Sequence, residues 1–260
     1  MGVSREGEIV SAIGTSGIVF ACIFGATLLG LFLRSILPEH HRSPESRNVV
    51  NLGIGQITTM AAMVLSLLIA SAKGSYDAQG SEITQFAANV ALLDRVLGHY
   101  GPEAREARDL LRSLVVRMLD QMWPKSGPRP AELDPRAAPA ESLYDTIHAL
   151  SPQSENQRSL RVEALKITAD LVRMRWLVYA QARSRLPRDL LIVLVIWAAV
   201  ISVSVGLYAP PNGTVVATLF VCALSLSAAI FLILELAEPF QGFIRVSSAP
   251  LRLALGLIGQ

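Results

Sequence analysis

The 260-residue chain is poor in charged residues, and several long stretches have none. Charged residues make up 17% of the sequence, against roughly 25% in soluble domains, and hydrophobic residues make up 52%. The formal net charge of +2 is too small to indicate nucleic-acid binding. The two cysteines, Cys22 and Cys222, lie inside apolar stretches, which gives no support to a disulfide framework or a metal site. This distribution is typical of a membrane protein rather than a soluble domain with a large core.

Recognisable catalytic and ligand-binding patterns are also missing. A Gly-x-Ser-x-Gly sequence is absent, and Gly53-x-Gly55 follows no predicted strand, so it is not a phosphate loop. His40 and His41 are neighbours in a short loop, with no third ligand at a suitable spacing. No apolar stretch has an ionisable residue near its middle, which argues against a proton-coupled transporter or a voltage sensor. The sequence therefore predicts no enzyme, no metal site and no cofactor.

Four apolar stretches are long enough to cross a bilayer. About 20 helical residues cover roughly 30 Å of hydrocarbon, and a crossing segment must satisfy its own backbone groups, which favours helices. The first stretch is too long for the apolar core of a cleaved signal peptide, so we expect it to remain as an anchor. The sequence predicts transmembrane helices over 9–37, 48–72, 190–209 and 214–234, a helical stalk over 73–189, and a turn with an amphipathic tail over 235–260.

The flanking cations predict an orientation. An even number of spans places both termini and the 73–189 insert on one side, and Pro210-Pro211-Asn212-Gly213 predicts a tight hairpin on the other. Basic residues are more numerous near the membrane on the insert side, which predicts that the insert is cytoplasmic. They are Arg5, Lys73, Arg183, Arg185, Arg188, Arg245 and Arg252 on that side, against Arg34, Arg42 and Arg47 in the first loop.

The insert has the periodicity of packed helices. Its apolar residues recur at spacings of three and four, as in a coiled coil or helical bundle. Gly101-Pro102 and Trp123-Pro124 end the first two helices, 125–140 is expected to be a loop, and a kink is expected at Pro187. We expect the outermost helices of the insert to continue the second and third spans. The stripes are Ile83, Phe86, Val90, Leu93, Leu97 and Tyr100; Ala104, Ala107, Leu111, Leu114, Met118 and Met122; Leu143, Ile147 and Leu150; and Leu160, Ala164, Ile167, Leu171, Met174 and Val178.

Small and weakly polar residues form a stripe along the second span. Asn51, Gly55, Thr58, Ala62 and Ser66 fall three or four apart, so they share one helix face. Such a face is typical either of close helix–helix contact or of a wetted pathway, and both hold if the stripe meets its own copies around an oligomer axis. Comparable ridges are Gly17, Ala21 and Gly25 in the first span, where contact is favoured more strongly, and Thr218, Cys222, Ser225 and Ala229 in the fourth.

The fourth span ends in the sequence LELAEPFQGFIRVS. Pro239 cannot continue helical hydrogen bonding, Gly242 permits a tight turn, and Phe240 supplies an apolar anchor. The simplest interpretation is a helix stop followed by a helix that lies on the membrane surface or packs on the insert. Alternatively, the carboxylates pair with a bound cation or with Arg183, Arg185 or Arg188. The predicted turn and anchor residues are Glu235, Glu238, Pro239, Phe240, Gly242 and Arg245.

The layout and this closing element resemble the bacterial bestrophin-like membrane family. The matching residues are Glu235, Glu238, Pro239, Phe240, Gly242, Arg245, Val246 and Ser247, with Asn51-x-Gly53-x-Gly55, Trp123-Pro124 and Leu186-Pro187. The chain departs from that family's pattern at Met122, where an acidic residue often precedes Trp-Pro, and at Glu238, where an Asp-Arg pair is expected near the Pro. Similarity to bestrophins implies a pentameric anion channel with the second span lining the pore and the insert forming a vestibule.

We therefore predict an all-α membrane protein with four transmembrane helices and a large helical cytoplasmic insert continuous with spans 2 and 3. It would form a homo-oligomer in the bacterial inner membrane, with both termini cytoplasmic. Its partners would be the lipid bilayer, further copies of the chain and small ions, and not nucleic acid. The leading functional hypothesis is a passive anion channel lined by the stripe of the second span. The alternative is a membrane-anchored helical scaffold or sensor whose insert binds a protein partner.

Overall fold

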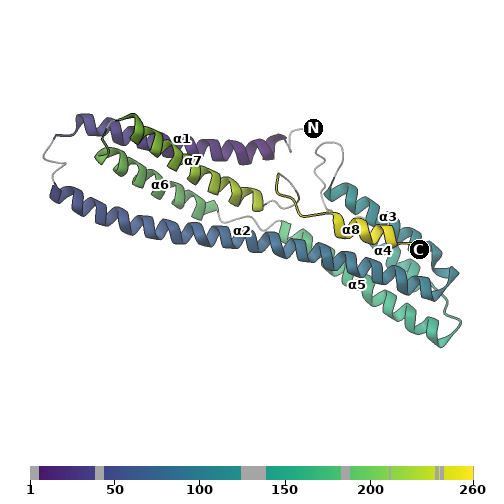
Figure 1. The fold of residues 1–260 in the computed structure, drawn as a ribbon. Coiled ribbons are helices and arrows are strands. Elements are labelled where there is room, and N and C mark those ends of the chain that lie inside the picture. The colour runs from purple at the N-terminus through teal and green to yellow at the C-terminus, as the bar shows by residue number, and fades with distance from the viewer. Residues whose placement is uncertain are drawn as a thin grey trace. The chain divides into compact units, whose positions relative to one another are not determined.

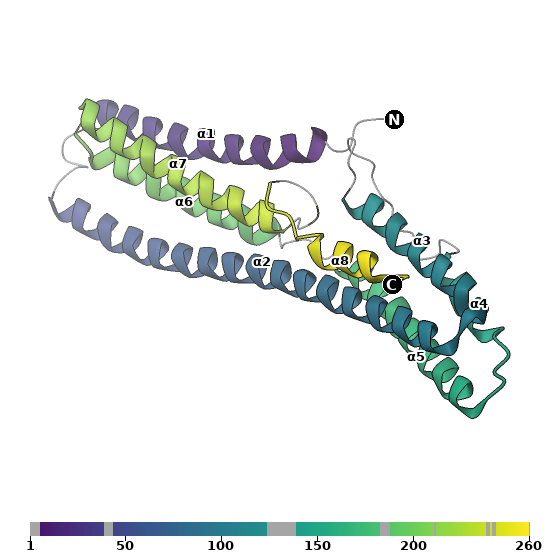
Figure 2. The same cartoon turned by 45° about the vertical axis from the view of Figure 1, so that its right-hand side comes forward.

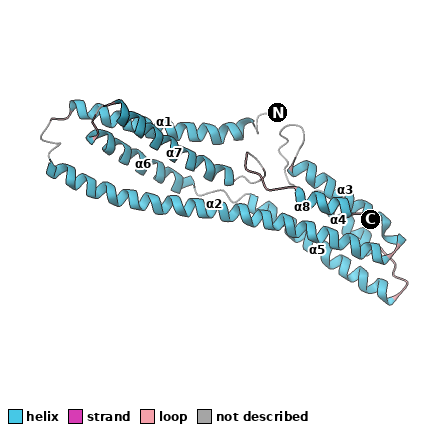
Figure 3. Cartoon of the chain, in the orientation of Figure 1, coloured by secondary structure: helices cyan, strands magenta, loops and turns pink. Residues whose placement is uncertain are grey.

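The described secondary structure is helical throughout. The computed structural model describes residues 6–38, 44–123, 139–182, 188–210, 212–237, 240 and 243–259, and no strand occurs among them (Figure 3). The elements are α1 (Glu6–Ile36), α2 (Pro44–Tyr100), the short 3-10 helix η2 (Pro102–Ala104), α3 (Arg105–Met122), α4 (Pro139–His148), α5 (Glu155–Ala182), α6 (Arg188–Tyr208), α7 (Gly213–Leu236) and α8 (Ala249–Leu257) (Figure 1).

Internal contacts divide the chain into two units. Among the described residues, the span unit contains those of 6–75 and 188–237, and the insert unit contains those of 76–182 and 240–259. Helix α2 contributes residues to both, because it continues without a break for 57 residues. The predicted span 48–72 and the first helix of the predicted insert thus lie within one helix. The corresponding junction with the third span, at 183–187, lies outside the described residues.

Four helices are long and apolar enough to cross a membrane: α1, α2, α6 and α7. The chain is accordingly an all-α membrane protein whose apolar helices contact lipid. In the span unit α1 packs along α6 and α7 (Figure 1, Figure 2). Buried Val19 and Ile23 of α1 meet Ala198 of α6 and Ala223 and Ile230 of α7.

Close backbone approach holds α1 against α6. A methyl group added to Gly30 would collide with the carbonyl oxygen of Val203, and one added to Gly206 would collide with the carbonyl oxygen of Thr27. Small residues allow this contact, as is common between membrane helices. The predicted ridge of Gly17, Ala21 and Gly25 is exposed instead, so the contact within the chain uses a different face of α1.

The insert unit buries most of the predicted stripes in one core, and Ile83 and Met122 in a second cluster with Val246. All stripe residues whose side chains are described are buried or partly buried, which confirms the helical periodicity inferred from the sequence. The predicted loop over 125–140 was wrong at its end, because α4 begins at Pro139. Proline is well accommodated at the first helical position, where its missing N–H is not needed. Residues 124–138 lie outside the described part.

The C-terminal helix belongs to this core. Leu251 and Ala254 of α8 are buried, as is Ile258 directly after it, and α8 packs against α3. Of the two placements left open for the amphipathic tail, the structure therefore has the one in which it packs on the insert.

Candidate functional site

The stripe predicted along the second span faces away from the rest of its unit. Asn51, Gly55, Thr58, Ala62 and Ser66 are all exposed on α2. The partly or fully buried side of this segment is a different one, formed by apolar residues. They are Val50, Ile54, Ile57, Ala61, Val64, Leu65, Leu68 and Ala72.

Helix α2 is at once the least apolar of the four long helices and the least covered. Only 6% of its most apolar window is buried within the chain, against 28%, 17% and 22% for α1, α6 and α7. A helix surrounded by lipid is expected to be the most apolar of a set, because hydrocarbon offers no hydrogen bonds. Helices α1, α7 and α6 follow this order and α2 alone departs from it, so the composition of α2 suits a covered or wetted position.

The hydroxyl groups on this segment are bonded to their own helix. The Thr58 hydroxyl donates to the carbonyl of Ile54 at 2.8 Å, and the Ser66 hydroxyl donates to the carbonyl of Ala62 at 2.8 Å. Each hydroxyl therefore presents only its oxygen lone pairs outward. The face is polar enough to tolerate water but carries no charge.

The segment after α7 packs against α2 at Tyr76 and against Trp123, directly after α3. The indole Nε1–H of Trp123 donates to the carbonyl of Val246 at 2.9 Å, and the Tyr76 hydroxyl donates to the carbonyl of Arg245 at 3.1 Å. The ring of Phe240 meets the ring of Trp123 edge-on, with centroids 5.8 Å apart. We call this set, Tyr76, Trp123, Phe240, Arg245 and Val246, the tail latch.

The tail latch brings together two motifs that lie far apart in the sequence. Trp123-Pro124 ends one helix, and the Pro-Phe-x-Gly element follows another more than a hundred residues later. Val246 is buried with Ile83 and Met122, so an apolar contact accompanies the hydrogen bonds. The only sequence signal for this pairing was the presence of an indole donor beside a helix stop.

The remaining predicted turn residues are described only in part. Glu235 is 3% exposed in the last turn of α7 and makes a polar or electrostatic contact. The side chain of Arg245 is exposed, and its backbone carbonyl is the group used by the latch. Glu238, Pro239, Gly242, Arg183 and Arg185, with the side chain of Arg188, lie outside the described residues. The predicted pairing of the carboxylates with these arginines thus stays a prediction.

Most of the chain, including the stripe and the latch, matches a known protein family. The family model of the Bestrophin-like domain matches residues 21–251, which include all of α2, the insert helices and the latch. The chain belongs to the Bestrophin-like family. Comparison with curated proteins and with solved structures finds no significant match.

A partly buried ion pair that the sequence analysis missed lies in the insert of this Bestrophin-like chain. Arg108 donates two hydrogen bonds to Asp94, Nε to Oδ1 at 2.7 Å and an Nη to Oδ2 at 2.9 Å. The hydrogen bond to the Asp94 carboxylate raises the already high pKa of Arg108. The backbone N–H of Gly259 also donates to Asp94 at 3.4 Å, so the pair ties the end of the tail to α2 and α3.

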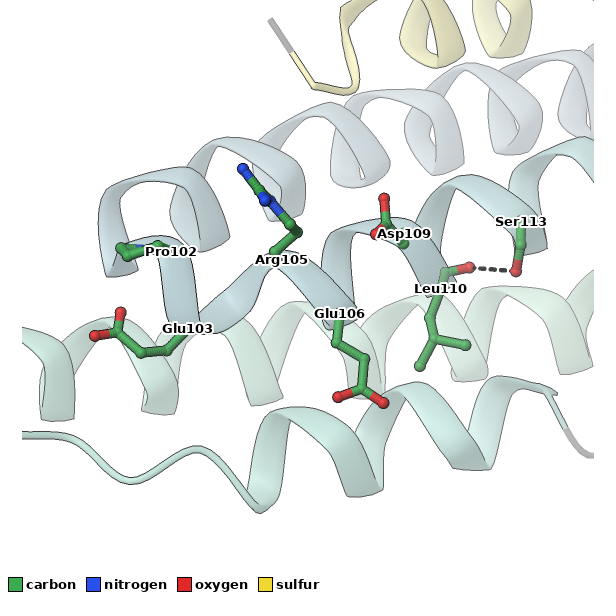
Figure 4. A pocket seen from close by; sticks show the side chains of 7 residues that line it. All are labelled: Pro102, Glu103, Arg105, Glu106, Asp109, Leu110 and Ser113. Atoms are coloured by element: carbon green, nitrogen blue, oxygen red, sulfur yellow. Dashed lines mark hydrogen bonds between the residues drawn. The ribbon is translucent and has the colours of Figure 1, made fainter.

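The insert of this Bestrophin-like protein also carries a shallow basin of about 580 Å³ along η2 and α3. Its lining is Pro102, Glu103, Arg105, Glu106, Asp109, Leu110 and Ser113. Figure 4 shows Arg105 and Asp109 projecting to one side of the α3 ribbon and Glu106 and Leu110 to the other. These groups do not converge on a common point, as a catalytic site requires. Among the described residues no three His, Cys, Asp or Glu side chains form a metal-binding group.

Proposed function

We propose that the chain forms a passive ion channel, preferring anions, as a homo-oligomer in the bacterial inner membrane. The stripe of α2 would line the pathway, and the insert and both termini would lie in the cytoplasm. The pentameric state is the expectation that similarity to bestrophins provides.

The observation that carries this proposal is the mismatch between the polarity of α2 and its exposure. The segment 47–73 has the exposed amides Asn48 and Asn51 on or beside the stripe, whereas the apolar runs of α1, α6 and α7 contain no amide. Moving an amide from water into hydrocarbon without a hydrogen-bond partner costs roughly 4–8 kcal/mol. Contact between copies, with water along the stripe, would remove most of that penalty. A single copy in lipid would carry all of it.

Anion preference is supported by the charges at the two ends of the stripe. Arg47 and Lys73 flank it, and no carboxylate lies between them in the sequence. Twenty-six helical steps place them about 39 Å apart, which is close to the roughly 40–45 Å of a bilayer with its headgroups. A pathway along this face would offer a cation at each mouth and only neutral groups between, so it would admit anions without binding them tightly.

Reconstitution into liposomes tests the proposal. Purified wild-type protein should release trapped chloride, and Thr58→Leu should reduce the flux several-fold, because a larger apolar group would narrow and dewet the pathway. Met60→Leu is the matched control, since Met60 is exposed two residues away on the opposite face of α2. No chloride flux at any voltage, pH or calcium level, or an equal loss in both variants, would contradict the proposal.

A second candidate is the membrane-anchored scaffold. It is favoured by exposed apolar side chains on the insert, which include Leu92, Val116, Val162 and Trp176. Under this alternative, Val162→Glu should abolish a cellular phenotype that Thr58→Leu leaves intact. The channel proposal expects the reverse pattern.

A further inference from the structure

Two arginines and a tyrosine lie at one end of the span unit. Figure 1 and Figure 2 show the end of α1, the start of α2 and the end of α6 together there. Arg34, in the last turn of α1, donates a hydrogen bond to the carbonyl of Ala209, directly after α6. The guanidinium of Arg47, in the first turns of α2, lies over the ring of Tyr208, 5.8 Å from its centroid. Both guanidinium groups therefore contact adjacent residues at the end of α6, Arg34 at Ala209 and Arg47 at Tyr208.

Both arginines keep hydrogen-bonding capacity. A guanidinium has five N–H donors, and Arg34 needs one of them for Ala209. Stacking on an aromatic ring uses the face of the Arg47 group and leaves its N–H edge available. Neither arginine is in an ion pair with a carboxylate of the described part of the chain. From 34 to 47 the sequence has three arginines and two glutamates, so the segment as a whole is also positive.

The depth of the cluster suits the phosphate layer of a bilayer. Arg34 directly follows the apolar run of α1, Arg47 directly precedes that of α2, and Tyr208 ends that of α6. Tyrosine and arginine at the end of an apolar run lie at the level of the lipid headgroups. Capping of α6 by Arg34 explains one arginine but gives no reason for the second.

We propose that Arg34, Arg47 and Tyr208 form a binding site for a phosphate group. The paired guanidinium groups would hold the phosphate oxygens, a geometry for which arginine is better suited than lysine. The phosphate would come from a phospholipid headgroup or from free phosphate. The site shares Arg47 with one mouth of the proposed pathway, but its test measures lipid binding rather than ion flux, so either proposal can fail without the other.

Lipid titration of the full-length protein tests this site. Delipidated protein in detergent would be titrated with phosphatidylglycerol, with a galactolipid that has no phosphate, and with inorganic phosphate, and adducts counted by native mass spectrometry. We expect Arg47→Gln to weaken binding of phosphatidylglycerol by about tenfold, the size of one charge-assisted hydrogen bond. Arg95→Gln is the matched control, because Arg95 is an exposed arginine on the same helix but in the insert unit. Galactolipid binding should be equal in all variants.

Further variants separate the outcomes. Tyr208→Leu should reproduce the loss seen for Arg47→Gln, and Tyr208→Phe, which keeps the ring, should not. A tenfold loss confined to inorganic phosphate would support the site and identify free phosphate as its ligand. If Arg47→Gln and Tyr208→Leu both match Arg95→Gln with phosphatidylglycerol and with inorganic phosphate, the proposal is overturned.

Discussion

Replacing Trp123 by phenylalanine should release the C-terminal tail from the insert. The substitution keeps an aromatic ring against Phe240 but removes the indole N–H that donates to Val246 at 2.9 Å. Because Val246 is buried, its carbonyl would lose its partner without gaining water, which costs about 1–2 kcal/mol. Trp123→Ala also removes the edge-on ring contact, worth about 0.5–1.5 kcal/mol, and part of the apolar cluster. We therefore expect about 3 kcal/mol for the alanine variant.

Hydrogen exchange in α8 measures this release directly. The reporter amides are those of Arg252 and Ile258, which donate to the carbonyls of Ser248 and Ala254 at 3.0 and 3.2 Å. A loss of 1–2 kcal/mol should speed their exchange by roughly 5- to 30-fold if the tail opens as a unit. Trp176→Phe is the control, because Trp176 is 47% exposed on α5. Unchanged exchange in Trp123→Phe, or equal acceleration in the control, would refute the latch.

Three further predictions concern packing and buried polar groups. Tyr100→Phe should raise the free energy of unfolding by about 1 kcal/mol, because the buried Tyr100 hydroxyl has no hydrogen-bond partner among the described residues. Burial raises the pKa of Tyr100, so the native state holds this proton more tightly than the unfolded state does. The wild type should therefore lose stability above about pH 10. A pH series of denaturant titrations should show a smaller loss in Tyr100→Phe. In thermal unfolding in detergent, Gly206→Leu should destabilise the protein by about 1–3 kcal/mol through collision with α1, while Gly17→Leu, where a Cβ meets nothing within 4 Å, should not. Asp94→Asn and Arg108→Gln should each destabilise the insert, and their double-mutant cycle should give a coupling of about 1–3 kcal/mol; additive effects would contradict the bidentate pair.

The helices and their buried faces were predictable because they depend on local spacing. Apolar residues three and four apart marked the faces that became the insert core, and Gly101-Pro102 marked the end of α2. Gly101 has φ of 124°, a conformation that few other residues adopt, so this stop is encoded in one position. The end of the 125–140 loop was wrong because proline both breaks and begins helices.

Contacts between distant segments were not predictable from the same signals. The contact of Trp123 with Val246 joins residues 123 positions apart, and no periodic pattern links them. Asp94 and Arg108 each follow a core residue of their stripe, so helical spacing alone assigned them to solvent. The α2 stripe was visible as a small-residue face, but its exposure depends on which face of the helix the neighbouring helices cover.

The central claim is that the stripe of α2 faces water among identical copies while the opposite face of α2 meets lipid. It is tested most directly by thiol modification in proteoliposomes, in a background where Cys22 and Cys222 are replaced by serine. Ala62 and Met60 are both exposed within the chain, but they lie about 200° apart around the helix. A charged, membrane-impermeant thiol reagent should modify Ala62→Cys rapidly and leave Met60→Cys unmodified. Equal rates at the two positions, or faster modification of Met60→Cys, would contradict the account.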